Sequence, residues 1–280
     1  MDLAYYGIDV SQQDLANILR PYNNPQGYND DKSVALEEFE PVVKNYRLIF
    51  YSRPNGTVNL VKSFLANDIP VLTRTWLKED DYSQKSSAYI GHFRILTGFD
   101  DAAQEFIQMD SIEGSRRFSY SQFLRLWQPF NYEYAVIAPL EKEGAIRAIL
   151  GPEESSQVAW SNAKQRAQDE LKTNPQSLYS NFNLSVAYYS LGQYQDSVQT
   201  FSKIRQRLPI KMLWYQLEPV LAYQQTKDYP EVFTLTDQIF QSGNPAFAEA
   251  YIVRGDAYLA QENKEAARRE YQKAYLYNQN

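Results

Sequence analysis

The 280-residue sequence contains no cysteine and one histidine, His92. Without cysteine the chain can form no disulfide bond, no thiolate zinc site and no cysteine nucleophile of its own. Its 34 acidic residues outnumber its 28 lysines and arginines, and no basic cluster stands out, so we expect no nucleic-acid partner. No apolar run reaches the roughly 18 residues of a membrane-spanning helix, and the N-terminus lacks the pattern of a signal peptide. We therefore expect no membrane segment in this chain.

Two further absences concern ligands. Glycine-rich phosphate loops and His/Cys metal-ligand spacings are missing, so the sequence predicts no cofactor and no metal site.

The sequence contains enough hydrophobic residues to form a core, because 44% of the residues are hydrophobic and 22% are charged. The length favours about two domains.

The character of the sequence changes near residue 150. Before that point, short helical segments alternate with β-like runs such as RLIFYS (47–52) and YEYAVIA (132–138). After GPEESS (151–156) the strand signals disappear. We therefore predict an α+β domain at residues 1–150 and an all-α domain at residues 151–280.

The second half repeats itself with a period close to that of tetratricopeptide repeats, helix pairs of about 34 residues. An Ala-Tyr pair recurs in steps of 35 residues, at Ala187, Ala222 and Ala257. The best unit, residues 178–209, resembles the tetratricopeptide consensus, a degenerate copy runs from about Leu213 to Pro245, and a third covers residues 250–277. Gly and Ala in such units lie where the two helices of a pair approach closely. The array predicts a docking surface for a protein partner.

His92 lies at the head of an apolar run that can be interpreted as a β-hairpin. Residues 92–98 would run in, 99–104 would turn and 105–110 would run back, so that opposed residue numbers sum to 202 and His92 faces Asp110. Facing Cβ atoms are about 4.5–5.5 Å apart, close enough for the carboxylate to accept from the imidazole, although one bulge would break this register. Asp110 would then orient His92 as a catalytic base. The alternative is a lone histidine hydrogen-bonded at a strand end.

Arg94 would share the sheet face of His92. It could meet an acidic group of a substrate, or it could form a surface salt bridge.

Three segments then resemble one enzyme family. They are YIGHFRILTGFDD (89–101), FIQMDSIEG (106–114) and FSYSQFLRLWQPFNYEYAVIAP (118–139). Together they are similar to the papain-like cysteine peptidases related to bacteriocin-leader processing enzymes, cysteine peptidase family thirty-nine. The resemblance implies a papain-like α+β fold, a peptide or protein substrate and hydrolysis through a Cys-His-Asp triad, with His92 as the base and Asp110 as the orienting carboxylate.

The resemblance also implies a nucleophile that this sequence does not contain. In the family a Cys-Gly-Pro segment, preceded by a Gln, opens the helix that ends in a segment like MDLAYYG (1–7), which places the cysteine ahead of Met1. We expect an N-terminally truncated peptidase-like domain, fused to tetratricopeptide repeats and inactive as given. The alternative is a pseudoenzyme, a peptide-binding module on a repeat scaffold. A homodimer is a further candidate assembly, and the compartment cannot be read, since exported family members carry their targeting segment in this N-terminal region.

Overall fold

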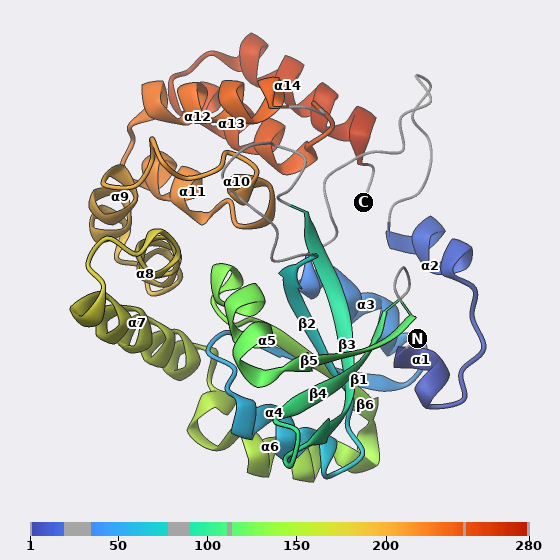
Figure 1. The fold of residues 1–280 in the computed structure, drawn as a ribbon. Helices are drawn as coiled ribbons and strands as arrows, with labels where there is room; N and C mark the ends of the chain where they lie inside the picture. Colours follow the sequence, from blue (N-terminus) through green and yellow to red (C-terminus); the bar gives the residue numbers. More distant parts are fainter. Residues whose placement is uncertain (1, 20–34, 78–89, 111–113, 243–244, 279–280) are drawn as a thin grey trace. The chain divides into compact units, whose positions relative to one another are not determined.

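The computed structural model describes residues 2–19, 35–77, 90–110, 114–242 and 245–278 (Figure 1). Contacts divide the chain into two compact units. The first unit contains Met1–Ser11 and Ala35–Asn183, and the second contains Gln12–Val34 and Leu184–Asn280.

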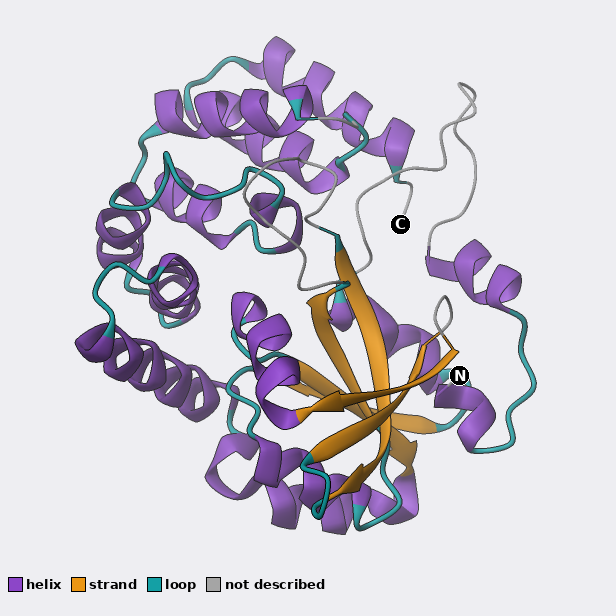
Figure 2. Cartoon of the chain, in the orientation of Figure 1, coloured by secondary structure: helices purple, strands orange, loops and turns teal. Residues whose placement is uncertain are grey.

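An antiparallel sheet forms the centre of the first unit. Within the described residues its strands are β1 (Leu48–Arg53), β2 (Val71–Trp76), β3 (Gly91–Asp100), β4 (Glu105–Asp110), β5 (Gly114–Ser119) and β6 (Tyr134–Pro139). They are ordered β1-β6-β2-β3-β4-β5 and form one twisted sheet in Figure 2. The last strand is therefore inserted between the first two. All six residues of β2 and five of the six of β6 are buried, as expected for central strands covered on both faces.

One face of this sheet carries the larger apolar core. Three helices cover it: α4 (Val58–Leu65), α5 (Tyr120–Trp127) and α6 (Glu143–Leu150). Thr57 begins α4 because its side chain accepts a hydrogen bond from the Leu60 amide. Directly before it, a Cβ on Gly56 would lie 2.2 Å from the Trp127 ring. Only glycine therefore lets α5 pack this closely against the start of α4.

The opposite face carries a smaller core. Leu72, Ile95 and Ala135 alternate with residues of the larger core along their strands and so point the other way. They pack against η1 (Leu36–Glu38) and α3 (Phe39–Lys44), and Figure 1 shows α5 in front of the strands and α3 behind them. The remaining short elements of this unit are α1 (Asp2–Tyr5), η2 (Gln128–Phe130), η3 (Leu140–Lys142) and η4 (Gly151–Glu154).

Helix α7 (Ser156–Thr173) belongs to the sheet-containing unit, as does the start of α8 (Leu178–Ser190). The Tyr132 hydroxyl donates to Glu170 at 2.7 Å, and Arg166 donates to the Gly56 carbonyl at 2.8 Å. Burial of the Tyr132 ring raises the pKa of its hydroxyl above the usual range, so the hydroxyl stays a donor. The domain boundary expected at residue 150 stays a prediction.

The second unit is helical. Its described helices are α2 (Gln12–Leu19), the end of α8, α9 (Tyr194–Ser202), α10 (Met212–Tyr215), α11 (Glu218–Gln225), α12 (Tyr229–Gln241), α13 (Ala248–Ala260) and α14 (Lys264–Tyr277). The turns of the three hairpins α8–α9, α11–α12 and α13–α14 each contain a residue with positive φ: Gly192, Lys227 and Glu262. These residues lie 35 apart, the step expected from the sequence. An α+β domain followed by helical repeats is confirmed.

Close helix approach within a repeat is clearest at Gly255. A Cβ at this position would lie 2.4 Å from the Tyr271 ring, so α13 and α14 meet at a contact that no larger residue permits. The equivalent residue 70 positions earlier, Ser185, shares a buried hydrogen bond of 3.1 Å with Ser197 between α8 and α9. Small residues between paired helices are therefore a shared feature of these two hairpins.

Candidate active site

Strand β3 presents His92 and Arg94 on one face of the sheet. Their partners on β2 are Thr75 and Thr73, respectively. Alternate residues of a strand share a face, so the pattern His-x-Arg places an imidazole and a guanidinium side by side near one end of the sheet.

His92 and Asp110 are in direct contact. The Nε2 atom of His92 lies 2.6 Å from Oδ2 of Asp110, a hydrogen-bonding distance across neighbouring strands. The expected pairing of strands is therefore correct, and the two side chains share a face.

The expected register is wrong in detail. Ile95 pairs with Met109, so paired residue numbers sum to 204 on that side of a bulge between Leu96 and Gly98, and to 205 on the other. One step further along this register, Arg94 lies opposite Asp110, and His92 is the diagonal neighbour. Diagonal neighbours on paired strands are about 7–8 Å apart, with their Cβ atoms somewhat closer, and the imidazole spans this gap.

The chemistry of the two groups fixes their roles in the hydrogen bond. An ionised carboxylate only accepts, so Nε2 of His92 must carry the hydrogen, and in the neutral ring Nδ1 keeps the free lone pair. The Asp110 side chain is fully buried, whereas 12% of the His92 side chain is exposed. The arrangement can therefore orient a base whose side chain is partly accessible to solvent.

Arg94 places a positive charge next to the Asp110 carboxylate. Its Nε lies 3.8 Å from Oδ2 of Asp110, and its Nη atoms donate to the main-chain oxygens of Trp76 at 2.6 Å and Leu77 at 2.5 Å and to the Thr75 hydroxyl. The side chain is fully buried, so neither expected role, a surface salt bridge or a contact with an acidic substrate, describes it. A buried arginine favours the ionised form of a neighbouring carboxylate.

Gln108 is a further buried polar residue on the same face as Asp110. It has no exposed surface, and neither its amide nitrogen nor its amide oxygen has a hydrogen-bond partner among the described residues. The alternation Phe106, Gln108, Asp110 in β4 was the sequence signal that could have placed it on this face. We find no physical reason in the described structure for its burial.

Asp2 is a second unexpected feature, in α1. Both carboxylate oxygens are buried without a hydrogen-bond partner among the described residues, and burial raises the pKa of the group from 3.8 to about 7. The neighbouring Tyr6 hydroxyl also lacks a partner there, and burial together with the charge of Asp2 raises its pKa.

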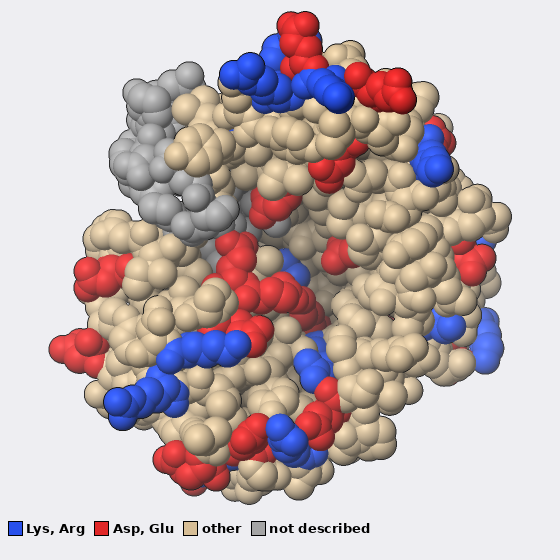
Figure 3. Space-filling model, turned by 180° about the vertical axis from the view of Figure 1, so that it is seen from behind, with Lys and Arg blue, Asp and Glu red and all other residues tan. Residues whose placement is uncertain are grey.

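The described part of the chain was searched for metal sites and for helices that could cross a membrane, and its surface charges were compared. No group of three or more His, Cys, Asp or Glu side chains that could hold a metal ion is present among those residues. None of the helices in the described ranges has the length and apolar character to cross a bilayer. On the face drawn in Figure 3, Lys and Arg side chains lie next to Asp and Glu side chains.

Two segments of the chain match known family models. Residues 1–135 match the Peptidase_C39 like family, and residues 237–280 match the Tetratricopeptide repeat. The first match includes β3 and β4 and thus both His92 and Asp110. No curated protein matches the chain. The two resemblances seen in the sequence are confirmed.

Proposed function

We propose that this chain, which joins a Peptidase_C39-like domain to tetratricopeptide repeats, uses the first to engage a peptide substrate and the second to bind a protein partner. In the peptidase-like domain His92 is the general base and Asp110 the carboxylate that orients it. The observation that supports these roles is the 2.6 Å contact between Nε2 of His92 and the buried Asp110 carboxylate.

The reaction that such a pair serves is amide-bond hydrolysis by a thiol. Nδ1 of His92 takes the proton of the thiol as the sulfur attacks the carbonyl carbon, and then gives that proton to the leaving amine as the C–N bond breaks. The resulting thioester is hydrolysed by a water molecule that His92 deprotonates in turn. Asp110 stabilises the imidazolium in both steps, and Arg94 favours the ionised form of Asp110.

This chain holds the base and the orienting carboxylate but no cysteine. We therefore propose that this 280-residue chain does not form the thioester, since the removal of the nucleophile from such a triad costs several orders of magnitude in rate. The absence of cysteine also supports a second function, a pseudoenzyme that binds an extended peptide beside His92 without cleaving it.

A matched set of proteins tests the assignment. One is the chain itself, and another is the chain extended at its N-terminus by a helix that begins with Gln and Cys-Gly-Pro. Hydrolysis of a quenched fluorescent peptide library is measured for both, and for the extended chain with its Cys changed to Ala, with His92→Ala and with Asp110→Asn. We expect thiol-dependent hydrolysis only in the extended chain, and His92→Ala should lower the rate by about 10²–10⁴-fold.

Two results would contradict the proposal. Thiol-dependent hydrolysis that persists after His92→Ala would show that His92 is not the base. Hydrolysis by the unextended chain that persists in its own His92→Ala variant would show a chemistry unrelated to this pair. Peptide binding by the unextended chain, lost in His92→Ala and without cleavage, would favour the pseudoenzyme.

A further inference from the structure

The last repeat carries an open groove on its outer helix. The groove has a volume of about 490 Å³ and is formed mainly by one face of α14. Its lining residues are Leu259 from α13 and Lys264, Ala267, Arg268, Tyr271, Gln272 and Tyr275 from α14. The α14 positions recur every three or four residues, the spacing of the side of a helix that packs against a neighbouring helix.

The floor of the groove is apolar and exposed. Leu259 is 48% exposed and Tyr275 is 64% exposed, and both are among the most exposed large hydrophobic residues of the described chain. The Tyr271 ring is held in place because its hydroxyl donates to Asp256 at 2.6 Å. Such a patch, rimmed by polar groups, is typical of a surface that another molecule covers.

The charges of the groove are of one sign. Lys264 and Arg268 are its charged lining residues, and neither has an acidic partner among the described residues. The other two cations of α14 are paired, Arg269 with Glu265 at 2.6 Å and Lys273 with Glu270 at 3.0 Å.

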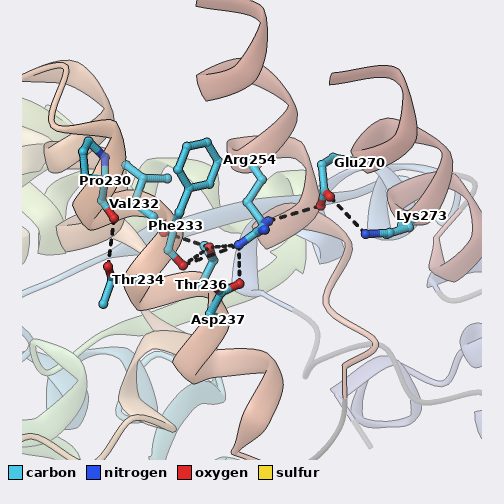
Figure 4. Close-up of polar contacts among 9 residues, drawn as sticks. All are labelled: Pro230, Val232, Phe233, Thr234, Thr236, Asp237, Arg254, Glu270 and Lys273. Atoms are coloured by element: carbon cyan, nitrogen blue, oxygen red, sulfur yellow. Dashed lines mark hydrogen bonds and ion pairs between the residues drawn. The ribbon is translucent and has the colours of Figure 1, made fainter. Parts of the chain in front are cut away.

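The arginine of the neighbouring helix α13 also has acidic partners. Arg254 of α13 contacts Asp237 at 2.6 Å and Glu270 at 3.2 Å, and Figure 4 shows it reaching from α13 to carboxylates on both adjoining helices. The two groove cations therefore differ from the other cations of α13 and α14, Arg254, Arg269 and Lys273, which all contact carboxylates. Like charges four residues apart on a helix repel each other, so a bound anion would relieve this repulsion.

We propose that this groove docks an acidic amphipathic helix of a partner protein. Apolar side chains of the partner cover Leu259, Tyr271 and Tyr275, and two of its carboxylates, one turn apart, pair with Lys264 and Arg268. Residues four apart rise about 6 Å along a helix, so the same spacing on the partner matches the two cations. This inference rests on the interaction role proposed for the repeats and is independent of His92 and Asp110.

A pair of designed peptides tests the proposal on the full chain. The first is a fluorescent helical peptide of about 18 residues with leucines on one face and two glutamates four residues apart beside them. The second is identical except that both glutamates are lysines. Fluorescence anisotropy should show binding of the glutamate peptide only, weaker in 0.5 M than in 0.05 M salt to an extent set by screening.

Matched variants locate the binding site. Arg268→Gln and Tyr275→Ala should each weaken the glutamate peptide by about threefold to tenfold. Arg269→Gln removes the same charge one residue away, outside the groove, and should change the affinity less than about twofold. The proposed active site is tested by hydrolysis in the extended chain and this groove by the difference between the Arg268→Gln and Arg269→Gln variants, so failure of one proposal can be told from failure of the other.

Three outcomes would overturn the inference. They are equal binding of the two peptides, an equal loss in the Arg268→Gln and Arg269→Gln variants, and no binding of the glutamate peptide at all. A fourth outcome is self-association of the chain, measured by sedimentation, that the Tyr275→Ala substitution abolishes. It would assign the groove to a second copy of the chain and would overturn the proposal of an acidic partner helix.

Discussion

Replacing Asp2 by Asn should stabilise the protein, and the gain should depend on pH. Burial raises the pKa of the Asp2 carboxyl from 3.8 to about 7. The folded protein thus holds this proton more tightly than the unfolded chain, so the stabilising contribution is fully present below about pH 4 and is lost as the pH rises to about 7. A shift of about three pKa units corresponds to about 4 kcal/mol, at 1.36 kcal/mol per unit.

Asn keeps the size of the side chain and removes the charge. At pH 8 the Asp2→Asn variant should therefore gain up to about 4 kcal/mol in free energy of unfolding. At pH 4, where the acid is protonated in the folded state, the gain should fall to near zero. The value at pH 8 is an upper bound, because α1 has four residues and can detach locally at a lower cost than global unfolding.

Urea unfolding followed by tryptophan fluorescence at pH 4, 6 and 8 measures this difference. Asp9→Asn, at an exposed aspartate seven residues further on, is the control and should change stability by less than about 0.5 kcal/mol at each pH. A gain that is the same at pH 4 and pH 8, or that grows as the pH falls, would refute the reasoning.

Three further substitutions test other features of the structure. Asp110→Asn should lower the population of the Nε2–H tautomer of His92, read from imidazole ¹⁵N shifts, because an amide can donate as well as accept. Gly255→Ala should destabilise the protein by about 1–3 kcal/mol in chemical denaturation, because the new methyl group overlaps the Tyr271 ring. Gln108→Leu should stabilise it by about 1–3 kcal/mol, seen as a higher melting temperature, because a buried amide that has no hydrogen-bond partner among the described residues is replaced by an apolar side chain.

Each of these three substitutions can be checked against a control measurement or a contrary outcome. His92 is the only histidine, so its ring signals need no further assignment. Gly144→Ala in α6 adds a methyl group with no atom within 4 Å and should not destabilise, so an equal loss at Gly144 and Gly255 would exclude the close approach as the cause. A large loss of stability in Gln108→Leu would show that the amide has a partner.

The repeats and the hairpin could be predicted because local patterns determine them. The 35-residue step in the sequence reappears as left-handed turn residues at Gly192, Lys227 and Glu262. The hairpin strands were expected at residues 92–98 and 105–110, and β3 and β4 extend over 91–100 and 105–110.

The bulge between Leu96 and Gly98 could not be predicted in the same way. Near the turn the paired residue numbers sum to 205 instead of the expected 202, and the bulge then changes this sum by one, to 204, while the contact between His92 and Asp110 survives. A histidine side chain tolerates such a shift because it reaches a diagonal neighbour.

The environment of Arg94 was missed for a different reason. A charged residue is most often exposed, and its burial here depends on main-chain oxygens of Trp76 and Leu77, which belong to a different strand and the residue that follows it. Hydrogen-bond acceptors that another part of the chain contributes cannot be predicted from the spacing of residues along one segment.

The insertion of β6 between β1 and β2 has a consequence for synthesis of the protein. Leu48 at the start of β1 pairs with Pro139 at the end of β6, 91 residues later, whereas β3, β4 and β5 pair with their neighbours in sequence. At about 5–20 residues per second on the ribosome, β1 must wait about 5–20 s for its partner. During that interval the edges of β1 and β2 that later pair with β6 are open to chaperones and to aggregation, so the nascent chain should be most vulnerable just before residue 139 emerges.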